Sequence, residues 1–210
     1  MDITVNNVTK IIKGNTVLSD INLEFQSGKI YGIVGKNGSG KTMLLRILAG
    51  LIRPTEGTVS VDGQKLHKDI SFPPDMGIII EKPELLEQLT GLENLKLLAE
   101  IKGIISEEQI IDFMNLFSLD PKSKKTLRKY SLGMKQKIGI IQAIMEGQRL
   151  LILDEPFNAL DEATVVMLRE LFQKYRQENR LLILTSHHRE DIDILCDEIF
   201  AMQDGGVDGN

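Results

Sequence analysis

The sequence predicts an α/β protein with a mainly parallel core sheet, an N-terminal antiparallel β region and a helical insert. Three observations lead to this fold class: strand patterns fill the first third of the chain, helical patterns fill the middle, and the two alternate in the last third. Strands that alternate with helices form a parallel sheet covered on both faces, because each helical crossover returns the chain to the same end of the sheet.

The first third contains the expected β region. Alternating apolar residues at Asp2–Val8 and Val17–Phe25 predict two half-buried strands, and Gly14-Asn15 between them is typical of a turn. The apolar run Ile30–Val34 ends at Gly35 and fits a buried strand. After it we expect a helix at 42–51 and further strands at 57–63 and 77–80.

The middle of the chain is predicted to be a mostly helical insert, at about residues 84–145, within a single domain of residues 1–210. Helical periodicity occurs at 93–102, 107–117 and 132–145. Ser106 and Gln109 have the spacing of a capping box at the start of the second helix. The last third adds strands at 150–153, 181–185 and 199–202 and helices at 163–179 and 190–196, before a tail rich in Gly and Asp.

Composition and charge exclude several classes of function. The net charge is −5 and no block of five like charges occurs, so we expect no nucleic acid as a ligand. The single cysteine, Cys196, rules out an intrachain disulfide, and we interpret it as a small buried apolar residue in a reducing compartment. No ten consecutive residues lack Asp, Glu, Lys and Arg, so we expect any membrane-spanning part in another chain.

A phosphate-binding loop is predicted between the strand ending near Val34 and the helix that follows. The segment matches G-x-x-x-x-G-K-[ST], and its expected ATP-binding residues are Gly35, Lys36, Asn37, Gly38, Ser39, Gly40, Lys41 and Thr42. Its glycines let consecutive backbone N–H groups curl around an anion. Lys41 supplies positive charge to the β- and γ-phosphates, and the Thr42 hydroxyl ligates Mg²⁺. A glycine-rich turn with an unrelated lysine is the alternative, but a strand before the loop and a helix after it favour Mg-ATP.

Two adjacent acids follow the buried strand Leu150–Leu153. Ligands bind at the carboxyl ends of strands in open α/β sheets, so Asp154 and Glu155 are expected beside the phosphate loop. We predict that Asp154 faces the Mg²⁺ held by Thr42. Glu155 is the candidate general base that takes a proton from the attacking water. An ordinary acidic turn is the alternative, and the phosphate loop makes it the weaker one.

Together these segments resemble the ATP-binding subunit of ABC transporters, over about residues 2–204 and with the motifs in the same order. Tyr130–Gln136 reads Y-S-L-G-M-K-Q and resembles the ABC signature, usually L-S-G-G-Q. Asn158–Asp161 resembles the D-loop, and Thr185-Ser186-His187 resembles the segment of the switch histidine. The resemblance implies a P-loop NTPase fold of ABC type.

The resemblance also implies roles for the signature residues. Ser131, Gly133 and Met134 lie at the start of the predicted helix 132–145, whose N-terminal end suits a γ-phosphate. In the family they contact the ATP held by the partner, which implies a head-to-tail ATP-sandwich dimer with a second copy of this chain or a related ATPase subunit. Ser131 is equally expected as a helix N-cap.

Two further roles are carried over in the same way. His187 would hydrogen-bond the γ-phosphate and help to align Glu155, and Asp161 would link the two active sites across the dimer. For His187 the alternative is that it and His188 are two surface histidines.

The chain departs from the family pattern at three places. Ile12 occupies the position where an aromatic residue often stacks on adenine, so we expect an apolar contact there. Glu81 stands at the Q-loop position in place of glutamine, and we expect it to keep the sensing role with an altered pH or metal dependence. Leu132 and Met134 in the signature, with segments 81–83 and 89–95, are similar to a branch associated with bacitracin resistance and lantibiotic immunity.

The predicted function is therefore binding and hydrolysis of Mg-ATP by the energy-coupling subunit of an ABC transporter. The resemblance implies a peripheral protein at the cytoplasmic face of the membrane that drives a transmembrane permease subunit and exports peptides or amphipathic compounds. The segment 81–94 would receive the permease, with core burial as an equal alternative for its leucines. A soluble ABC-type ATPase and a nucleotide-sensing regulator are the competing functions, and the intact Glu155 and His187 argue against a pure sensor.

Overall fold

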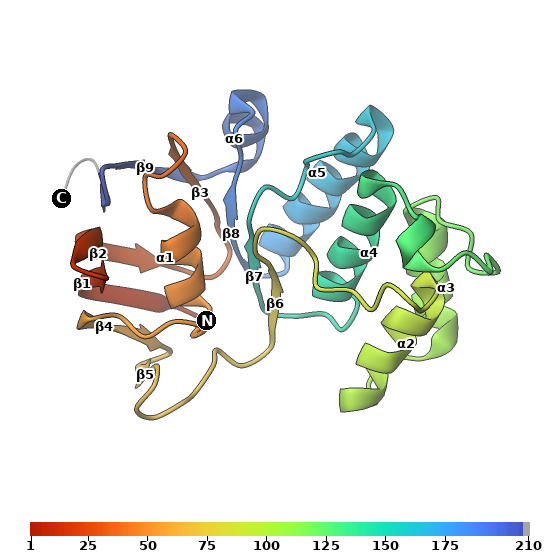
Figure 1. The fold of residues 1–210 in the computed structure, drawn as a ribbon, viewed down its shortest axis with the longest axis horizontal. Coiled ribbons are helices and arrows are strands. Elements are labelled where there is room, and N and C mark those ends of the chain that lie inside the picture. Colours follow the sequence, from red (N-terminus) through yellow and green to blue (C-terminus); the bar gives the residue numbers. More distant parts are fainter. Residues whose placement is uncertain (208–210) are drawn as a thin grey trace.

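The computed structural model describes residues 1–207 and confirms the α/β class with a mainly parallel core sheet (Figure 1). Within these residues the larger sheet has six strands in the order β10-β9-β3-β8-β7-β6. All neighbouring pairs are parallel except β9 and β10, which pair antiparallel. Their bounds are β3 (Ile30–Gly35), β6 (Met76–Ile79), β7 (Leu150–Leu153), β8 (Leu181–Thr185), β9 (Glu198–Gln203) and β10 (Gly206–Val207). The last three residues of the predicted tail lie outside the described part.

The expected N-terminal β region forms a separate antiparallel sheet in the order β2-β1-β4-β5. Its strands are β1 (Ile3–Ile12), β2 (Asn15–Phe25), β4 (Glu56–Val61) and β5 (Gln64–Lys65). Helix α1 (Lys41–Leu48) packs in one hydrophobic cluster with this sheet and one face of the parallel strands, and Figure 1 shows it between the two sheets. The loop between β3 and α1 thus connects the larger sheet to a helix that packs against both sheets.

Both faces of the parallel sheet are buried, because successive side chains of a strand point to opposite sides. In β7, Leu150 and Ile152 pack with α1 and the small sheet, whereas Leu151 and Leu153 pack with the helices on the other face. This double burial explains why the central strands read as continuous apolar runs rather than as an alternating pattern.

The region between β6 and β7 is helical. It contains α2 (Gly91–Lys102), α3 (Glu107–Leu116), a 3₁₀ turn at Leu127–Lys129 and α4 (Leu132–Ile144). Ser106 and Gln109 form the capping box predicted from their spacing. Thr90 and Glu93 form a second capping box that sequence reasoning missed, and it starts α2 two residues earlier than expected.

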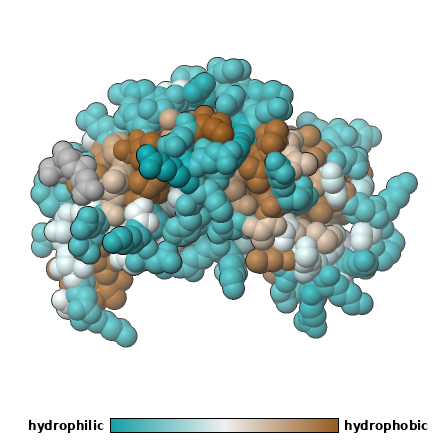
Figure 2. Space-filling view, turned by 90° about the horizontal axis from the view of Figure 1, so that it is seen from above, coloured by the Kyte–Doolittle hydropathy of each residue, from teal (hydrophilic) through white to brown (hydrophobic). Residues whose placement is uncertain are grey.

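The remaining helices, α5 (Glu162–Gln177) and α6 (Arg189–Leu195), follow β7 and β8. Helix α1 ends at Leu48 rather than at the predicted residue 51, because the chain leaves the helix at Ala49 and Gly50 adopts a φ of +74°. Seen from above, the surface is mostly hydrophilic, with hydrophobic side chains gathered in separate patches (Figure 2). Among residues 1–207 no helix is long and apolar enough to cross a membrane.

The contact between β6 and α4 leaves no space for a side chain at Gly77. A Cβ there would lie 1.8 Å from the Ala143 carbonyl oxygen, which is fixed in the helix backbone. We expect Gly77→Ala to lower the free energy of unfolding by about 1–3 kcal/mol or more, because sheet and helix must separate. Gly206→Ala is the control, since its Cβ would meet no atom of the described residues closer than 3.6 Å. Urea unfolding of both variants checks this, and equal stabilities would contradict it.

Candidate functional site

The loop between β3 and α1 is closely packed against neighbouring residues at two of its glycines. A Cβ at Gly35 would lie 2.3 Å from the Met202 carbonyl oxygen, and one at Gly40, where φ is +104°, would lie 2.8 Å from Leu18 Cδ2. Gly38 also has a positive φ but has open space around its Cβ position. The loop therefore requires glycine for close approach at both ends and remains accessible in its middle.

Lys41 places its ammonium group across this loop. Its Nζ donates to the carbonyl oxygens of Gly35 at 2.7 Å and Lys36 at 3.1 Å, and the residue is only 7% exposed. Because Lys41 is also the first residue of α1, the positive charge and the unpaired N–H groups of the helix N-terminus lie at the same place. This arrangement attracts an anion.

The Asp154 carboxylate is held by two hydroxyl groups. Its Oδ2 accepts from Thr42 Oγ1 at 2.9 Å and its Oδ1 accepts from Thr185 Oγ1 at 2.6 Å, and Asp154 is 6% exposed. Hydroxyl and carboxylate oxygens are the ligands that Mg²⁺ prefers, and it usually takes one or two of them from the protein and the rest from phosphate and water. Thr42 and Asp154 therefore fit a magnesium ion bound together with a nucleotide.

Glu155 is held beside Asp154 in a left-handed backbone conformation, with φ +51°. Its N–H donates to Thr185 Oγ1 at 2.9 Å, and its Oε2 accepts the His187 N–H at 3.1 Å. Its Oε1 lies 3.2 Å from His187 Nε2 but has no hydrogen-bond partner among residues 1–207. Burial raises the pKa of the Glu155 carboxyl above its usual value, and the backbone N–H and imidazole of His187 oppose this rise. A carboxylate of raised pKa is a stronger proton acceptor.

These groups share one cleft of about 360 Å³. The expected site residues in its lining are Asn37, Gly38, Gly40, Lys41, Thr42, Glu81, Asp154, Glu155 and His187. Glu81 also adopts a left-handed conformation, with φ +64°, and its Oε1 lies 2.9 Å from Arg46 Nη2. The charge that distinguishes this chain at the Q-loop position is therefore paired within the cleft.

Several predicted residues lie outside this cleft. Ile12 ends β1 and is 37% exposed, but it does not line the cleft. The signature residues Ser131, Gly133 and Met134 are also absent from its lining. Ser131 is the N-cap of α4 and accepts the Met134 N–H, so the N-cap role expected for this residue is present. Contacts of the signature with a nucleotide in a partner stay a prediction.

Asp161 has a structural role within its own chain. It is the N-cap of α5, where it accepts from the Thr164 N–H and hydroxyl, and its Oδ2 lies 2.7 Å from Lys137 Nζ. The hydrogen bond from Lys137, followed by those from Thr164, holds the pKa of the Asp161 carboxyl well below its usual range. This ion pair connects the first turns of α4 to the segment that follows Asp154 and Glu155.

Sequence reasoning missed four residues that shape the site. Thr185 is the last residue of an apolar strand, a signal close to the one that marked Asp154, so it could have been found. Arg46 lies four residues after Thr42, on the same face of α1, and could also have been found. Val17 lines the cleft from β2, and the buried Gln136 donates its Nε2 to the Pro156 carbonyl oxygen at 3.1 Å. Nothing in the local sequence marks Val17, whereas Gln136 lies in the segment that resembles the ABC signature.

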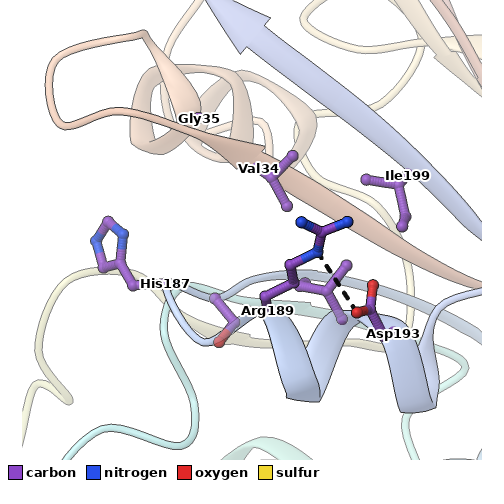
Figure 3. Close-up of a pocket in the computed structure, with 8 residues that line it drawn as sticks. Val34, Gly35, His187, Arg189, Asp193 and Ile199 are labelled. Carbon is purple, nitrogen blue, oxygen red and sulfur yellow. Dashed lines mark ion pairs between the residues drawn. The ribbon is translucent and has the colours of Figure 1, made fainter.

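A second cavity of about 370 Å³ adjoins the first, with Gly35 and His187 in its wall. Figure 3 shows Val34 and Ile199 facing Arg189 across it, with the His187 ring at its edge. Its charged groups are the exposed pair Arg189 and Asp193, 3.6 Å apart. This cavity lacks Lys41 and the Thr42–Asp154 pair, which line the first cleft.

Comparison with known proteins gives the class. Residues 18–158 match the family model described as "ABC transporter", and the chain belongs to this family. It is an ATP-binding ABC transporter ATPase with a P-loop fold.

Individual relatives indicate the branch of the ABC transporter family to which the chain is similar. The chain is 47% identical over 206 residues to YybJ of Bacillus subtilis (strain 168), an uncharacterized ABC transporter ATP-binding protein, covering 98% of this chain and 94% of the relative. It is 38% identical to the bacitracin transport ATP-binding protein BcrA of Enterococcus faecalis, covering 97% of this chain and 67% of that protein. It is 32% identical to the lantibiotic transport ATP-binding protein SrtF of Streptococcus pyogenes, covering 97% and 87%. The branch predicted from the signature and Q-loop residues is confirmed.

Solved structures agree with this class. An ATP-binding subunit of an ABC transporter superposes with a TM-score of 0.89 at 26% identity, covering 99% of this chain and 88% of that chain. The bacterial ABC transporter cassette MJ0796, solved as a dimer, has a TM-score of 0.87 at 25% identity, covering 98% and 96%.

The low pKa of Asp161 predicts a pH-dependent stability. A carboxylate whose folded pKa is depressed stabilises the protein above its unfolded pKa, and this contribution is lost as pH falls toward the folded pKa. Asp161→Asn keeps an N-cap oxygen but loses the ion pair, so we expect it to be less stable than the wild type at pH 7 by roughly 0.2–1 kcal/mol. The difference should shrink as pH falls below about 4.

Urea unfolding between pH 3 and pH 7 measures this difference. Lys137→Gln, which removes the cation from the other end of the pair, should show the same dependence on pH. A loss of stability that is constant across this range would show that Asp161 acts through capping alone.

Proposed function

We propose that this chain binds and hydrolyses Mg-ATP as the cytoplasmic energy-coupling subunit of an ABC exporter, as one ATPase domain over residues 1–210 with its helical insert at about 84–145. One observation carries this proposal. The Thr42–Asp154 pair and the Glu155–His187 pair lie in a single cleft with the phosphate loop, so metal ligands, base and phosphate donors converge on one point.

The residues divide the chemistry between them. N–H groups of the loop and the Lys41 ammonium bind the phosphates, while Thr42 and Asp154 hold the ion. Mg²⁺ bound there supplies positive charge to the transferring phosphoryl group. Glu155 takes a proton from the attacking water, and its hydrogen bond from the His187 N–H fixes the direction of its carboxylate. His187 then presents its ring to the γ-phosphate from the edge of the cleft.

Glu81 is proposed to sense the nucleotide in partnership with Arg46. The guanidinium compensates the charge that glutamate adds near the metal, which leaves the carboxylate able to accept from water. Ile12, at the end of the β1–β2 hairpin, is proposed to contact the base beyond the cleft.

A second copy of this chain or a related ATPase subunit is proposed to complete each site. Ser131, Gly133 and Met134 lie at the exposed start of α4 and outside their own cleft, which suits a contact across a head-to-tail dimer. Asp161 forms an ion pair with Lys137 of α4, and it would relay the state of one site to the other.

The permease partner is proposed to bind the segment between β6 and α2 at the cytoplasmic face of the membrane. Leu86 in this segment is 43% exposed, whereas Leu85 packs against the hydrophobic cluster of the helices. Export of a peptide or amphipathic compound is supported by the relatives named for bacitracin and lantibiotic transport.

Glu155→Gln tests the proposed chemistry. The amide cannot accept the proton, so the hydrolysis rate should fall by roughly 10²–10⁴-fold while Mg-ATP still binds. In the presence of ATP a stable dimer of the variant should then accumulate, and size-exclusion chromatography detects it. Phosphate release is measured in parallel. Glu108→Gln, at an exposed carboxylate on α3, is the matched control and should leave both unchanged. Unaltered phosphate release in Glu155→Gln would assign the base elsewhere, and a wild type that binds ATP without turnover would indicate a sensor.

A further inference from the structure

Three distant segments of the chain meet behind the phosphate loop. The Gly205 N–H, in the turn between β9 and β10, donates to the Ser39 carbonyl oxygen at 3.2 Å. The Gly205 carbonyl oxygen accepts the Ser19 N–H of β2 at 2.9 Å. Figure 1 shows the end of β9 reaching the side of the molecule where β1 and β2 lie. The turn therefore bridges the loop to the small sheet through one buried residue.

Gly205 and Gly40 lie so close to the backbone of β2 that neither position has space for a side chain. Gly205 has a φ of +82°, and a Cβ there would lie 2.6 Å from the Val17 carbonyl oxygen. The same oxygen would lie 3.1 Å from a Cβ at Gly40. On the other side of the turn, Met202 pairs with Gly35 in the β3–β9 register and is 3% exposed. The loop is thus enclosed from behind by Met202, Gly205 and β2.

The hydrogen bond at Ser39 also sets a direction in the loop. The C=O and N–H of a trans peptide point to opposite sides of its plane, and residues 1–207 contain no cis peptide bond. When the Ser39 carbonyl points at Gly205, the Gly40 N–H must point away from the turn. Gly40 itself lines the nucleotide cleft. An N–H aimed into the cleft is the donor that a phosphate requires.

We propose that Gly205 is a positioning residue for the phosphate loop. The turn between β9 and β10 holds the Ser39–Gly40 peptide in the orientation that binds phosphate, although Gly205 does not line the cleft. This inference rests on the proposed nucleotide binding and adds to it a segment some 160 residues away in sequence that sets nucleotide affinity.

Gly205→Ala tests the proposal against Gly63→Ala. Gly63 lies in the β4–β5 turn with a nearly equal φ of +79°, but its Cβ would meet nothing within 4 Å. Both variants therefore carry the same intrinsic backbone strain, and only Gly205→Ala displaces a neighbour. We expect Gly205→Ala to raise the dissociation constant for Mg-ATP about tenfold, and Gly63→Ala to change it less than about twofold. Fluorescence titration with a labelled ATP measures binding, and melting without nucleotide reports general stability.

Ser19→Pro is the second variant. It removes the N–H that binds the Gly205 carbonyl oxygen, at an exposed residue of β2, which is an edge strand of the small sheet. We expect it to weaken Mg-ATP binding in the same direction by about threefold or more. If Gly205→Ala does not yield folded protein, Ser19→Pro alone decides.

Equal affinities for Gly205→Ala and Gly63→Ala would overturn the proposal, even if both melt at lower temperature. The proposal would also be overturned if Ser19→Pro and a folded Gly205→Ala both bound Mg-ATP with the affinity of the wild type. A wild-type chain that does not bind Mg-ATP would instead contradict the proposed function, so the two failures are distinguishable.

Discussion

The site depends on one buried carboxylate. Asp154 is almost completely removed from water, and a charge in that position is costly unless each oxygen has a partner. Thr42 and Thr185 supply these partners, one from α1 and one from the end of β8. The same Thr185 hydroxyl accepts the Glu155 N–H and so fixes the residue that would act as base. The predicted phosphate loop, the proposed metal ligand and the proposed base are joined through this one network.

The parallel sheet determines where this network forms. Strand β7 lies between β6 and β8, in a register that brings the ends of all three to one edge of the sheet. The Asp154 N–H donates to the Ile79 carbonyl oxygen at 2.7 Å, which continues the pairing one residue beyond β7. Leu150 and Ile152 are buried on one face of β7 and Leu151 and Leu153 on the other, and a shift of one residue would exchange these two sets.

Much of this could be predicted from sequence because the information is local. Apolar runs, the glycine-rich loop and the acids after a buried strand are short patterns, and they predicted the fold class, the cleft and most of its lining. Strands of two residues, such as β5 and β10, have no periodicity to detect. Val17, Gln136 and Gly205 act through contacts with segments 20 to more than 160 residues away, and only the folded chain brings those partners together. Arg46 and Thr185 carried local signals that sequence reasoning did not use.

The central claim is that Thr42 and Asp154 share one metal ion at the phosphate loop. A crystal structure of the chain with Mg²⁺ and ATP tests it most directly. The account predicts the phosphates on the N–H groups of residues 38–42, Mg²⁺ about 2.0–2.1 Å from Thr42 Oγ1, and Asp154 bound to the ion directly or through one water. Phosphates bound away from this loop, or an ion that contacts neither side chain, would contradict it.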